Sequence, residues 1–528
     1  MMKLLNKLFF KANFLKIIMA GLFFLFYFYF VKFRIKNIMI DSDFSNFVLE
    51  ANDIIHGNFF LNDWQLTGLT FISTDLPYYS LMTLLFGIDI KSYAYASVLI
   101  FLVFVCACYF LVKDKLRISF FYKVIFFCIA CLPCEFAFFG MRSHTGAITL
   151  SLLGLYNIYC GIYRKGKLVF FNCALAWVFF TFAVTGDSVC IPFIILPVLC
   201  ISLFNLSRDY INCIKLNVDE IKISFTVLMS IITGKLLEKF YFHLGSASKN
   251  SFLETKQFIT LGEIYAKLSL FFQSLLKLFN ADFTGQGLFS YRIIFYVLGT
   301  SIVLTCMYTV VWNVFNYING KKYDRIALTL SIGFIMISTT CIITNICFDV
   351  GSSRYYATAP ALLSIVLLRT FDTNIKSLLT VVQFKRVSIL LSLLLIIYSS
   401  YKVFPLPHNN YKTDPSLYAL IDVLKKNNLG HGYSEFYTAS STTVYSKNVI
   451  KVRALIRTDN GLGQFKWFCK NDWYNDESHF IVVNKNGKGQ FFTRDDVENH
   501  LGKPNTILLS DPYLIYVYEK DISNLIIK

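Results

Sequence analysis

The sequence predicts a mainly α-helical protein that crosses a membrane many times and ends in a small α/β domain. Hydrophobic residues make up 55% of the 528 residues and charged residues only 16%, whereas soluble domains carry about 25% charged residues. Runs such as 14–31 and 93–112 are almost free of charge. Their length, about 20 residues, is what a helix needs to cross a bilayer. After residue 404 the apolar runs become short, which is typical of a water-exposed domain.

About eleven apolar runs are predicted to span the membrane as helices. An odd number of spans places the two chain ends on opposite sides, so we expect a membrane domain over 1–404 and an α/β domain over 405–528. The first run lacks a clear small-residue cleavage site, which favours an uncleaved anchor over a signal peptide. The predicted spans lie at about 14–31, 93–112, 118–138, 147–163, 168–185, 189–205, 223–242, 293–315, 326–346, 357–370 and 387–404.

Basic residues predict the orientation of these spans. Seventeen Lys and Arg residues lie in connections that alternate along the chain, and short connections rich in Lys and Arg face the cytoplasm. The N-terminus is therefore predicted to be cytoplasmic and the 405–528 domain extracytoplasmic. Lys32, Arg34 and Lys36 oppose this orientation, because they follow the first span on the predicted outer side. The seventeen residues are Lys113, Lys115, Arg117, Lys123, Arg164, Lys165, Lys167, Arg208, Lys215, Lys222, Lys321, Lys322, Arg325, Arg369, Lys376, Lys385 and Arg386.

Two predicted outer segments are long, at about 32–92 and 243–292. The weaker apolar stretch at 261–278 also contains charged residues, which is typical of an amphipathic helix at the membrane interface. The stretch at 76–88 is also predicted to be interfacial, with a short or re-entrant span as the alternative.

The terminal domain is predicted to mix helices and strands. Apolar residues recur with helical spacing at 417–424, and a second helix is expected at 495–501. Short strands are predicted at 442–445, 449–455, 480–483, 506–509 and 513–518.

The net charge of +17 does not indicate a nucleic-acid partner. From residue 406 onward 15 Lys and Arg face 13 Asp and Glu, so most of the positive charge lies beside the predicted spans, where it reports topology. No basic patch with interleaved aromatic residues is present, and nucleic-acid binding is excluded. The 14 cysteines show no zinc spacing. Cys131 and Cys134 have redox-motif spacing but fall inside a predicted span, where packing is the expected role.

Polar residues gather at the predicted outer ends of the spans. The first outer segment begins with Asp41 and Asp43 and continues through Asp63 and Trp64. Two carboxylates beside a membrane surface can supply a general base or hold a divalent cation such as Mg²⁺ or Mn²⁺. A solvated loop with turn-forming residues is the alternative interpretation.

Three shorter outer connections add further charged residues. They contain Arg142 with His144, Asp187, and Arg354 with Tyr355. A guanidinium group at headgroup level can hold a phosphate through two hydrogen bonds, and the alternative is that it only reaches toward lipid headgroups. Several such residues on one face favour a binding site.

These features resemble the GT-C superfamily of membrane glycosyltransferases. The resemblance lies in the Asp-rich loop after the first span, the Ser-Arg-Tyr-Tyr sequence at 353–356 before a late span, and the terminal α/β domain. The fragments 41–43, 51–58, 432–433 and 473–474, together with Trp467, are similar to bacterial members. Among these, the serotype-converting glucosyltransferases that modify O-antigen are similar in size, span number and outer tail. The first loop lacks the Asp-Glu pair that is commoner in the family.

The resemblance implies an inverting hexosyltransferase in a bacterial inner membrane. It would move a sugar such as glucose from an undecaprenyl-phosphate donor to a glycan such as the O-antigen of lipopolysaccharide, on the periplasmic side. Many relatives are expected to work without a metal, and Mg²⁺ or Mn²⁺ between the two aspartates stays an open alternative. The implied roles are base for Asp43 or Asp41, donor-phosphate binding for Arg354, Arg142, His144 and Tyr355, and acceptor or sugar binding for Asp63, Trp64 and Asp187.

Two other functions stay open from the sequence. An O-antigen or capsule polymerase also has many spans, but it would carry its largest loop between late spans, whereas here the largest outer part is the terminal domain. A lipid-linked sugar flippase or transporter would keep charges inside its spans. The main charges of that kind are Lys235, Glu238 and Lys239. The sequence does not define the oligomeric state.

Overall fold

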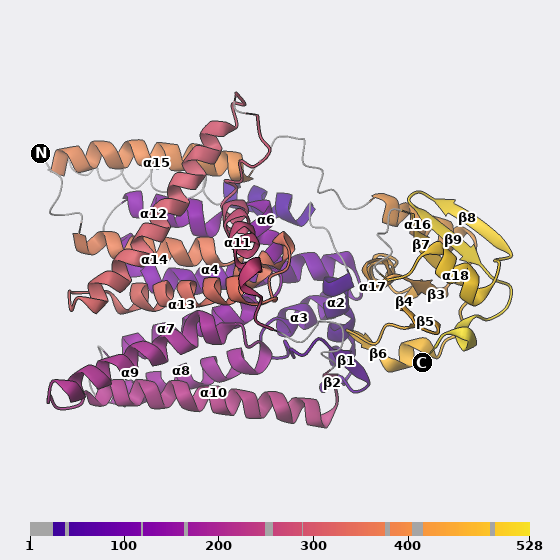
Figure 1. The fold of residues 1–528 in the computed structure, drawn as a ribbon, viewed down its shortest axis with the longest axis horizontal. Coiled ribbons are helices and arrows are strands. Elements are labelled where there is room, and N and C mark those ends of the chain that lie inside the picture. Colours follow the sequence, from indigo (N-terminus) through magenta and orange to yellow (C-terminus); the bar gives the residue numbers. More distant parts are fainter. Residues whose placement is uncertain are drawn as a thin grey trace, which may run out of the picture.

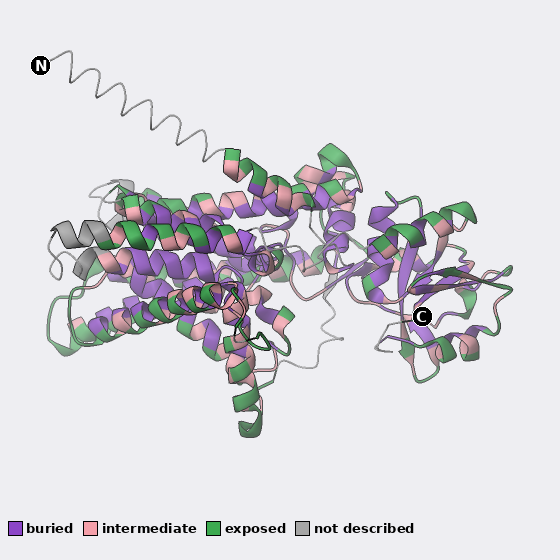
Figure 2. Ribbon diagram, turned by 90° about the horizontal axis from the view of Figure 1, so that it is seen from above, coloured by how far each residue is buried: buried purple, intermediate pink, exposed green. Residues whose placement is uncertain are grey.

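The computed structural model describes residues 25–36, 42–117, 120–162, 167–248, 257–287, 289–374, 381–403, 415–485 and 491–527. A bundle of long helices forms one part of the molecule, and a small sheet lies at one end of it (Figure 1). Buried residues lie in the interior of the helix bundle and in the central strands of the sheet (Figure 2). The predicted mainly α-helical class with a terminal sheet region is confirmed.

Within the described residues, five helices are long and apolar enough to cross a membrane. The predicted spans 147–163, 223–242, 357–370 and 387–404 fall largely on helical residues, 118–138 is interrupted, and 14–31 lies largely outside the described part of the chain. The five are α4 (Ile90–Leu116), Val169–Gly186 of α8 (Lys167–Gly186), Ile191–Ile211 formed by η2 (Ile191–Ile195) and α9 (Leu196–Ile211), α12 (Ile293–Ile318) and α13 (Arg325–Ile343). The other long helices are α7 (Thr145–Ile162), α10 (Val218–Leu244), α14 (Ala359–Asn374) and α15 (Val381–Val403).

The predicted span at 118–138 is broken instead of continuous. α5 (Phe120–Ile125) runs into a π-helical stretch, η1 (Phe126–Cys131), and the chain unwinds before α6 (Glu135–Gly140). Pro133 explains the break, because proline has no amide hydrogen and disfavours helical geometry in the residue before it. The carbonyl of Cys128 accepts hydrogen bonds from Ser399 Oγ at 3.3 Å and Lys402 Nζ at 2.8 Å.

Several of the Lys- and Arg-rich connections that were predicted to share one side of the membrane lie together at the end of the bundle away from the sheet. Arg369 of α14 donates a hydrogen bond to Asp324, just before α13, at 2.7 Å, and a second one to the carbonyl of Leu111 in α4. Arg325 of α13 forms an ion pair with Glu220 of α10. The turn between α9 and α10 lies at the same end, on the left of Figure 1.

The C-terminal region contains a six-stranded sheet with the order β5-β4-β3-β7-β9-β8. β3 pairs in parallel with β4 and β7, and the remaining pairs are antiparallel. The strands are β3 (His431–Ser434), β4 (Lys451–Thr458), β5 (Gly461–Gln464), β7 (Phe480–Asn484), β8 (Thr506–Ser510) and β9 (Tyr513–Val517), and the helices are α16 (Pro415–Lys426), α17 (Phe436–Tyr445) and α18 (Arg494–Leu501).

The strand predicted at 442–445 is wrong, because these residues end helix α17. The β-branched residues Thr442, Thr443 and Val444 favour a strand by propensity. In the helix the Thr442 hydroxyl donates to the carbonyl of Thr438 at 2.7 Å, and Thr443 bonds to the Val452 carbonyl of the neighbouring strand at 3.3 Å. Burial of the whole helix against α2 and β4 therefore outweighs local propensity.

The two long segments predicted to be outer loops both contain helices and lie at the end of the bundle that faces the sheet, here called the sheet-side end. The first contains α2 (Ser42–Ile55) and α3 (Leu76–Phe86), and the second contains α11 (Ile264–Leu278), which packs against α13. β1 (Trp64–Leu66) pairs with β2 (Ala247–Ser248) and with β6 (Cys469–Lys470). This small sheet fastens the C-terminal region to the bundle.

Candidate active site

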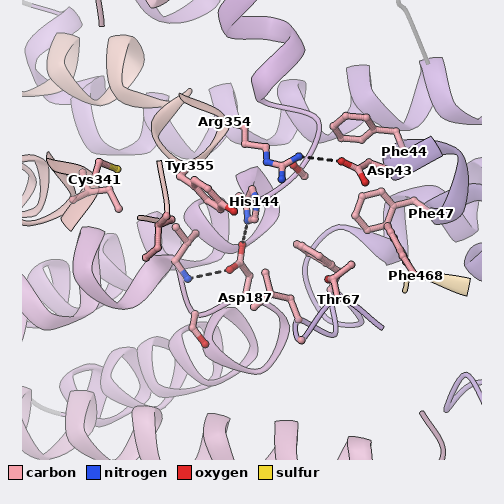
Figure 3. A pocket seen from close by; sticks show the side chains of 18 of the residues that line it. Asp43, Phe44, Phe47, Thr67, His144, Asp187, Cys341, Arg354, Tyr355 and Phe468 are labelled. Carbon is pink, nitrogen blue, oxygen red and sulfur yellow. Dashed lines mark hydrogen bonds and ion pairs between the residues drawn. The ribbon is translucent and has the colours of Figure 1, made fainter. Parts of the chain in front are cut away.

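A cavity of about 510 Å³ lies at the sheet-side end, between the bundle and the C-terminal region. Its lining comes from α2, the residues just before α7 and just after α8, helix α13, η4 (Val350–Tyr356) and residues 467–468. Figure 3 shows these side chains pointing toward one another. The lining includes five residues that the sequence singled out, namely Asp43, His144, Asp187, Arg354 and Tyr355.

Arg354 and Asp43 form an ion pair at the edge of this cavity. The guanidinium Nη1 lies 3.1 Å from Asp43 Oδ2 (Figure 3). Asp43 lies in the first turn of α2, where the helix dipole favours a negative charge. Arg354 lies in η4, whose start is capped by Asp349. Since the Arg354 side chain is 34% exposed and that of Asp43 19%, water and a ligand can both reach the pair.

Arg354 keeps a positive charge in this position. Burial opposes the charge, but the neighbouring Tyr355 and Asp43 outweigh it and raise the pKa of the guanidinium above its usual value. Burial also raises the pKa of the Tyr355 hydroxyl, which therefore stays protonated. Within the described residues Arg354 Nε has no hydrogen-bond partner, so the side chain has a donor left for an anionic ligand.

His144 and Asp187 form a second pair in the cavity. His144 Nδ1 lies 2.6 Å from Asp187 Oδ2, and Asp187 Oδ1 accepts the backbone N–H of Val189 at 2.9 Å (Figure 3). His144 has a φ angle of 64°, a left-handed conformation that is uncommon for residues other than glycine and often marks a functional position. Because Asp187 holds Nδ1, Nε2 is the ring nitrogen left for another partner.

Most of the remaining cavity wall is apolar. On the bundle side it consists of Val189, Pro192, Ile337 and Ile346. On the side of the C-terminal region it consists of aromatic rings, and Phe468 packs on Phe47 with ring centroids 5.5 Å apart. The cavity therefore places charged groups between an aliphatic wall and an aromatic wall.

Arg142 does not line the cavity, so its predicted role in binding a phosphate is not supported. It is 1% exposed, and its guanidinium lies 3.2 Å from the ring centre of Phe139 and 3.9 Å from that of Phe44. Its Nε donates to the Phe139 carbonyl at 2.7 Å, and its Nη1 bonds to the Tyr93 hydroxyl. Arg142 thus packs under the first turn of α2 and supports the residue next to Asp43.

Asp63 and Trp64, predicted to bind acceptor or sugar, lie outside the cavity lining. Trp64 is buried, donates its indole N–H to Asp53 at 2.9 Å and packs against Trp473 at 5.0 Å between centroids. The Asp63 carbonyl accepts the N–H of Asn471 at 2.9 Å. Both residues therefore attach the C-terminal region to the bundle. Asp41 falls outside the described residues.

A divalent cation does not fit the donors that the structure describes. Asp43 faces the guanidinium of Arg354, and Asp187 faces His144. In the described ranges no group of three or more His, Cys, Asp or Glu side chains is placed to hold a metal ion.

Sequence reasoning missed the aromatic wall, formed by Phe44, Phe47 and Phe468. The chain has 55 phenylalanines, and their spacing alone does not distinguish a site from lipid-facing packing. Trp467, which the sequence analysis named only as part of the resemblance, also lines the cavity. In the sequence, only the position of Trp467 in a polar segment of the C-terminal region indicates a role in the site.

Gly146, two residues after His144, permits a close contact that shapes the site. A Cβ atom at this position would lie 2.5 Å from the carbonyl oxygen of Thr74. We expect Gly146→Ala to destabilise the protein by about 1–3 kcal/mol through overpacking, measured as a lower unfolding temperature in detergent. Gly262→Ala is the matched control, because nothing lies within 4 Å of its added Cβ. Equal unfolding temperatures for the two variants would contradict the close contact.

In comparisons with known proteins, no family model and no curated protein matches the chain. The likeness to the GT-C superfamily therefore rests on the residues and the architecture named above. The function has to be argued from the geometry of the cavity.

Proposed function

We propose that the chain is an inverting membrane glycosyltransferase that moves a hexose such as glucose from an undecaprenyl-phosphate donor to a cell-surface glycan such as O-antigen. One observation carries this proposal. Segments that are far apart in the sequence bring a cation, a carboxylate and a His–Asp pair into one cavity at the end of a bundle of apolar helices. A lipid-linked phosphate needs a cation beside an apolar surface, and an acceptor hydroxyl needs a base.

The proposed setting is a bacterial inner membrane that the chain crosses about eleven times, with a cytoplasmic N-terminus and a periplasmic tail. The basic residues that meet at the end of the bundle away from the sheet support this orientation. The cavity lies at the opposite end. Its aliphatic wall then faces the bilayer that holds the polyprenyl chain, and its aromatic wall faces the periplasm, from which the glycan arrives.

Arg354 binds the donor phosphate in this proposal. Its guanidinium is charged and has a free Nε donor, and a guanidinium presents two parallel N–H groups to phosphate oxygens. Negative charge builds up on the phosphate as the sugar leaves, so this contact strengthens in the transition state. The Tyr355 hydroxyl is protonated and can donate to the same phosphate.

Asp43 acts as the general base. The acceptor oxygen attacks the anomeric carbon from the side opposite the phosphate, its proton passes to Asp43, and the bond from that carbon to the phosphate oxygen breaks. Without donor, Asp43 is held by Arg354 at 3.1 Å. A bound phosphate competes for the guanidinium and releases the carboxylate. The base therefore becomes available only when the donor is present.

The transporter alternative has less support from the contacts. Lys235 and Glu238 of α10 pair with each other at 2.5 Å, and Lys235 is 45% exposed. Neither residue lines the cavity. Lys235 Nζ also donates to the hydroxyl of Ser188, which lines the cavity, at 2.5 Å. These charges therefore form one pair on the side of α10 beside the cavity, and not a row of charges through the bundle.

Mass analysis of the surface polysaccharide, from cells with and without the gene, tests the proposed function. The expected result is the loss of one hexose from each repeat unit in the cells without the gene. A change of chain length with the same repeat mass would instead identify a polymerase. Unchanged repeat mass and chain length would contradict transfer to this glycan and would favour the transporter alternative.

A further inference from the structure

The segment 70–75 is built tightly into the sheet-side end, next to the His144–Asp187 pair. Thr70 Oγ1 donates to the Thr185 carbonyl at 2.7 Å, and Ser73 Oγ donates to the Phe182 carbonyl at 2.7 Å. The N–H of Phe71 bonds to the Gly186 carbonyl at 3.0 Å. The segment therefore covers the end of α8, immediately before Asp187.

Asp75 ends this segment as a fully buried carboxyl group. It is 0% exposed, and its Oδ1 accepts the N–H of Gly146 at 3.2 Å. Its Oδ2 has no hydrogen-bond partner within the described residues. The charged or titratable groups that act on it are Asp187 from the end of α8 and His144 from the start of α7, and Tyr78 is affected by it on its own helix.

Asp75, Asp187 and His144 thus lie together in one buried place. Burial first, and then the charge of Asp187, raise the pKa of Asp75 to about 7, although His144, the N–H of Gly146 and a hydrogen bond with the Thr74 side chain act in the opposite direction. A protonated Asp75 adds no negative charge beside Asp187 and His144. Asp187 can then hold the Nδ1–H of His144 without a second negative charge beside it.

We propose that Asp75 is a positioning residue of the site, which holds its own proton so that Asp187 and His144 act as one oriented pair. Two observations support this role. Residues 70–75 contact both the end of α8 and the start of α7, and Asp75 Oδ2 is buried without a hydrogen-bond partner in the described part of the chain. This role rests on the proposed glycosyl transfer, in which the pair with Asp187 orients the His144 ring beside the departing phosphate and leaves Nε2 to accept a hydrogen bond from a sugar hydroxyl. A charged Asp75 would add repulsion against that phosphate.

The first test does not depend on the proposed function. A carboxyl group whose pKa is raised by folding makes the protein less stable as pH rises from the unfolded value, 3.8, to the folded value of about 7. We therefore expect the unfolding temperature of the purified full chain in detergent to fall across this window. Asp75→Asn cannot ionise and should flatten that fall. Parallel curves for the two proteins would overturn the proposal.

The second test is the pH profile of sugar transfer, measured with a synthetic polyprenyl-phosphate glucose. We expect wild-type transfer to decline as pH rises above about 7. Between about pH 6 and about pH 8.5, Asp75→Asn should keep an about threefold larger fraction of its own activity than the wild type keeps. An equal loss at every pH would indicate a purely structural role and overturn the proposal.

Asp89→Asn is the matched control for both tests. Asp89 is also buried, at 5% exposure, caps α4 by accepting the N–H of Lys91 at 2.9 Å and lies outside the cavity lining. Its variant should leave the shape of both pH profiles as in the wild type. If the wild type shows no transfer at all, the proposed function fails, and the unfolding curves still decide the role of Asp75.

Discussion

Asp43→Asn is expected to abolish sugar transfer, with a rate loss of about 10²–10⁴-fold, the range that general-base catalysis contributes. The amide has nearly the shape of the carboxylate but cannot accept the acceptor's proton. The variant should still fold, because the ion pair with Arg354 is partly exposed and such pairs contribute about 0–1 kcal/mol. The measurement is transfer from polyprenyl-phosphate glucose in membranes that contain equal amounts of each protein.

Asp63→Asn is the control for this substitution. Asp63 is exposed, and its φ angle of 68° suits asparagine as well as aspartate. It lies outside the cavity, so its variant should transfer sugar at nearly the wild-type rate. Full activity of Asp43→Asn would remove Asp43 from the mechanism. Inactivity of both variants would show that the loss does not depend on the cavity.

Arg354→Lys is expected to lower transfer by about tenfold or more and to raise the KM for the lipid donor, because hydrogen bonds from a charged group contribute about 1.5–3 kcal/mol. Lysine keeps the charge and can still reach Asp43, but it presents a single ammonium group in place of a planar pair of N–H donors. The KM for the acceptor should change less than the KM for the donor.

Arg494→Lys provides the matched control, because Arg494 lies on the exposed face of α18 and pairs with Glu498 at 2.8 Å. Its variant should keep both KM values. If Arg354→Lys also left the donor KM and the rate unchanged, Arg354 would only be reaching toward lipid headgroups. The proposed function would then lack a site for the donor phosphate. The role of Asp43 would still be decided by the transfer rate of Asp43→Asn.

Some sequence predictions failed for identifiable physical reasons. Residues 442–445 were predicted as a strand from β-branched composition, but burial on two sides makes them a helix. Arg142 and Trp64 were assigned to binding because polar or aromatic residues near a membrane surface suggest a site. In the structure Arg142 packs on the rings of Phe44 and Phe139, and Trp64 holds the C-terminal region in place. Their partners lie far away in the sequence, so composition alone gives no sign of them.

The sequence by itself determined the apolar helices, the terminal sheet region and the set of polar residues from which the site is built. These properties depend on the length of apolar runs and on local spacing, which any stretch of about 20 residues carries within itself. The charge pattern also grouped Asp43, His144, Asp187, Arg354 and Tyr355 on one predicted face.

Only the tertiary structure decided how these residues pair. Asp43 and Arg354 are 311 positions apart, and His144 and Asp187 are 43 apart, so no local pattern links them. The burial of Asp75 and the aromatic wall from Phe468 likewise depend on packing between distant segments. Such contacts form only when the helix ends and the C-terminal region pack together. Each side chain of the site is then held by close-packed neighbours from several elements at once.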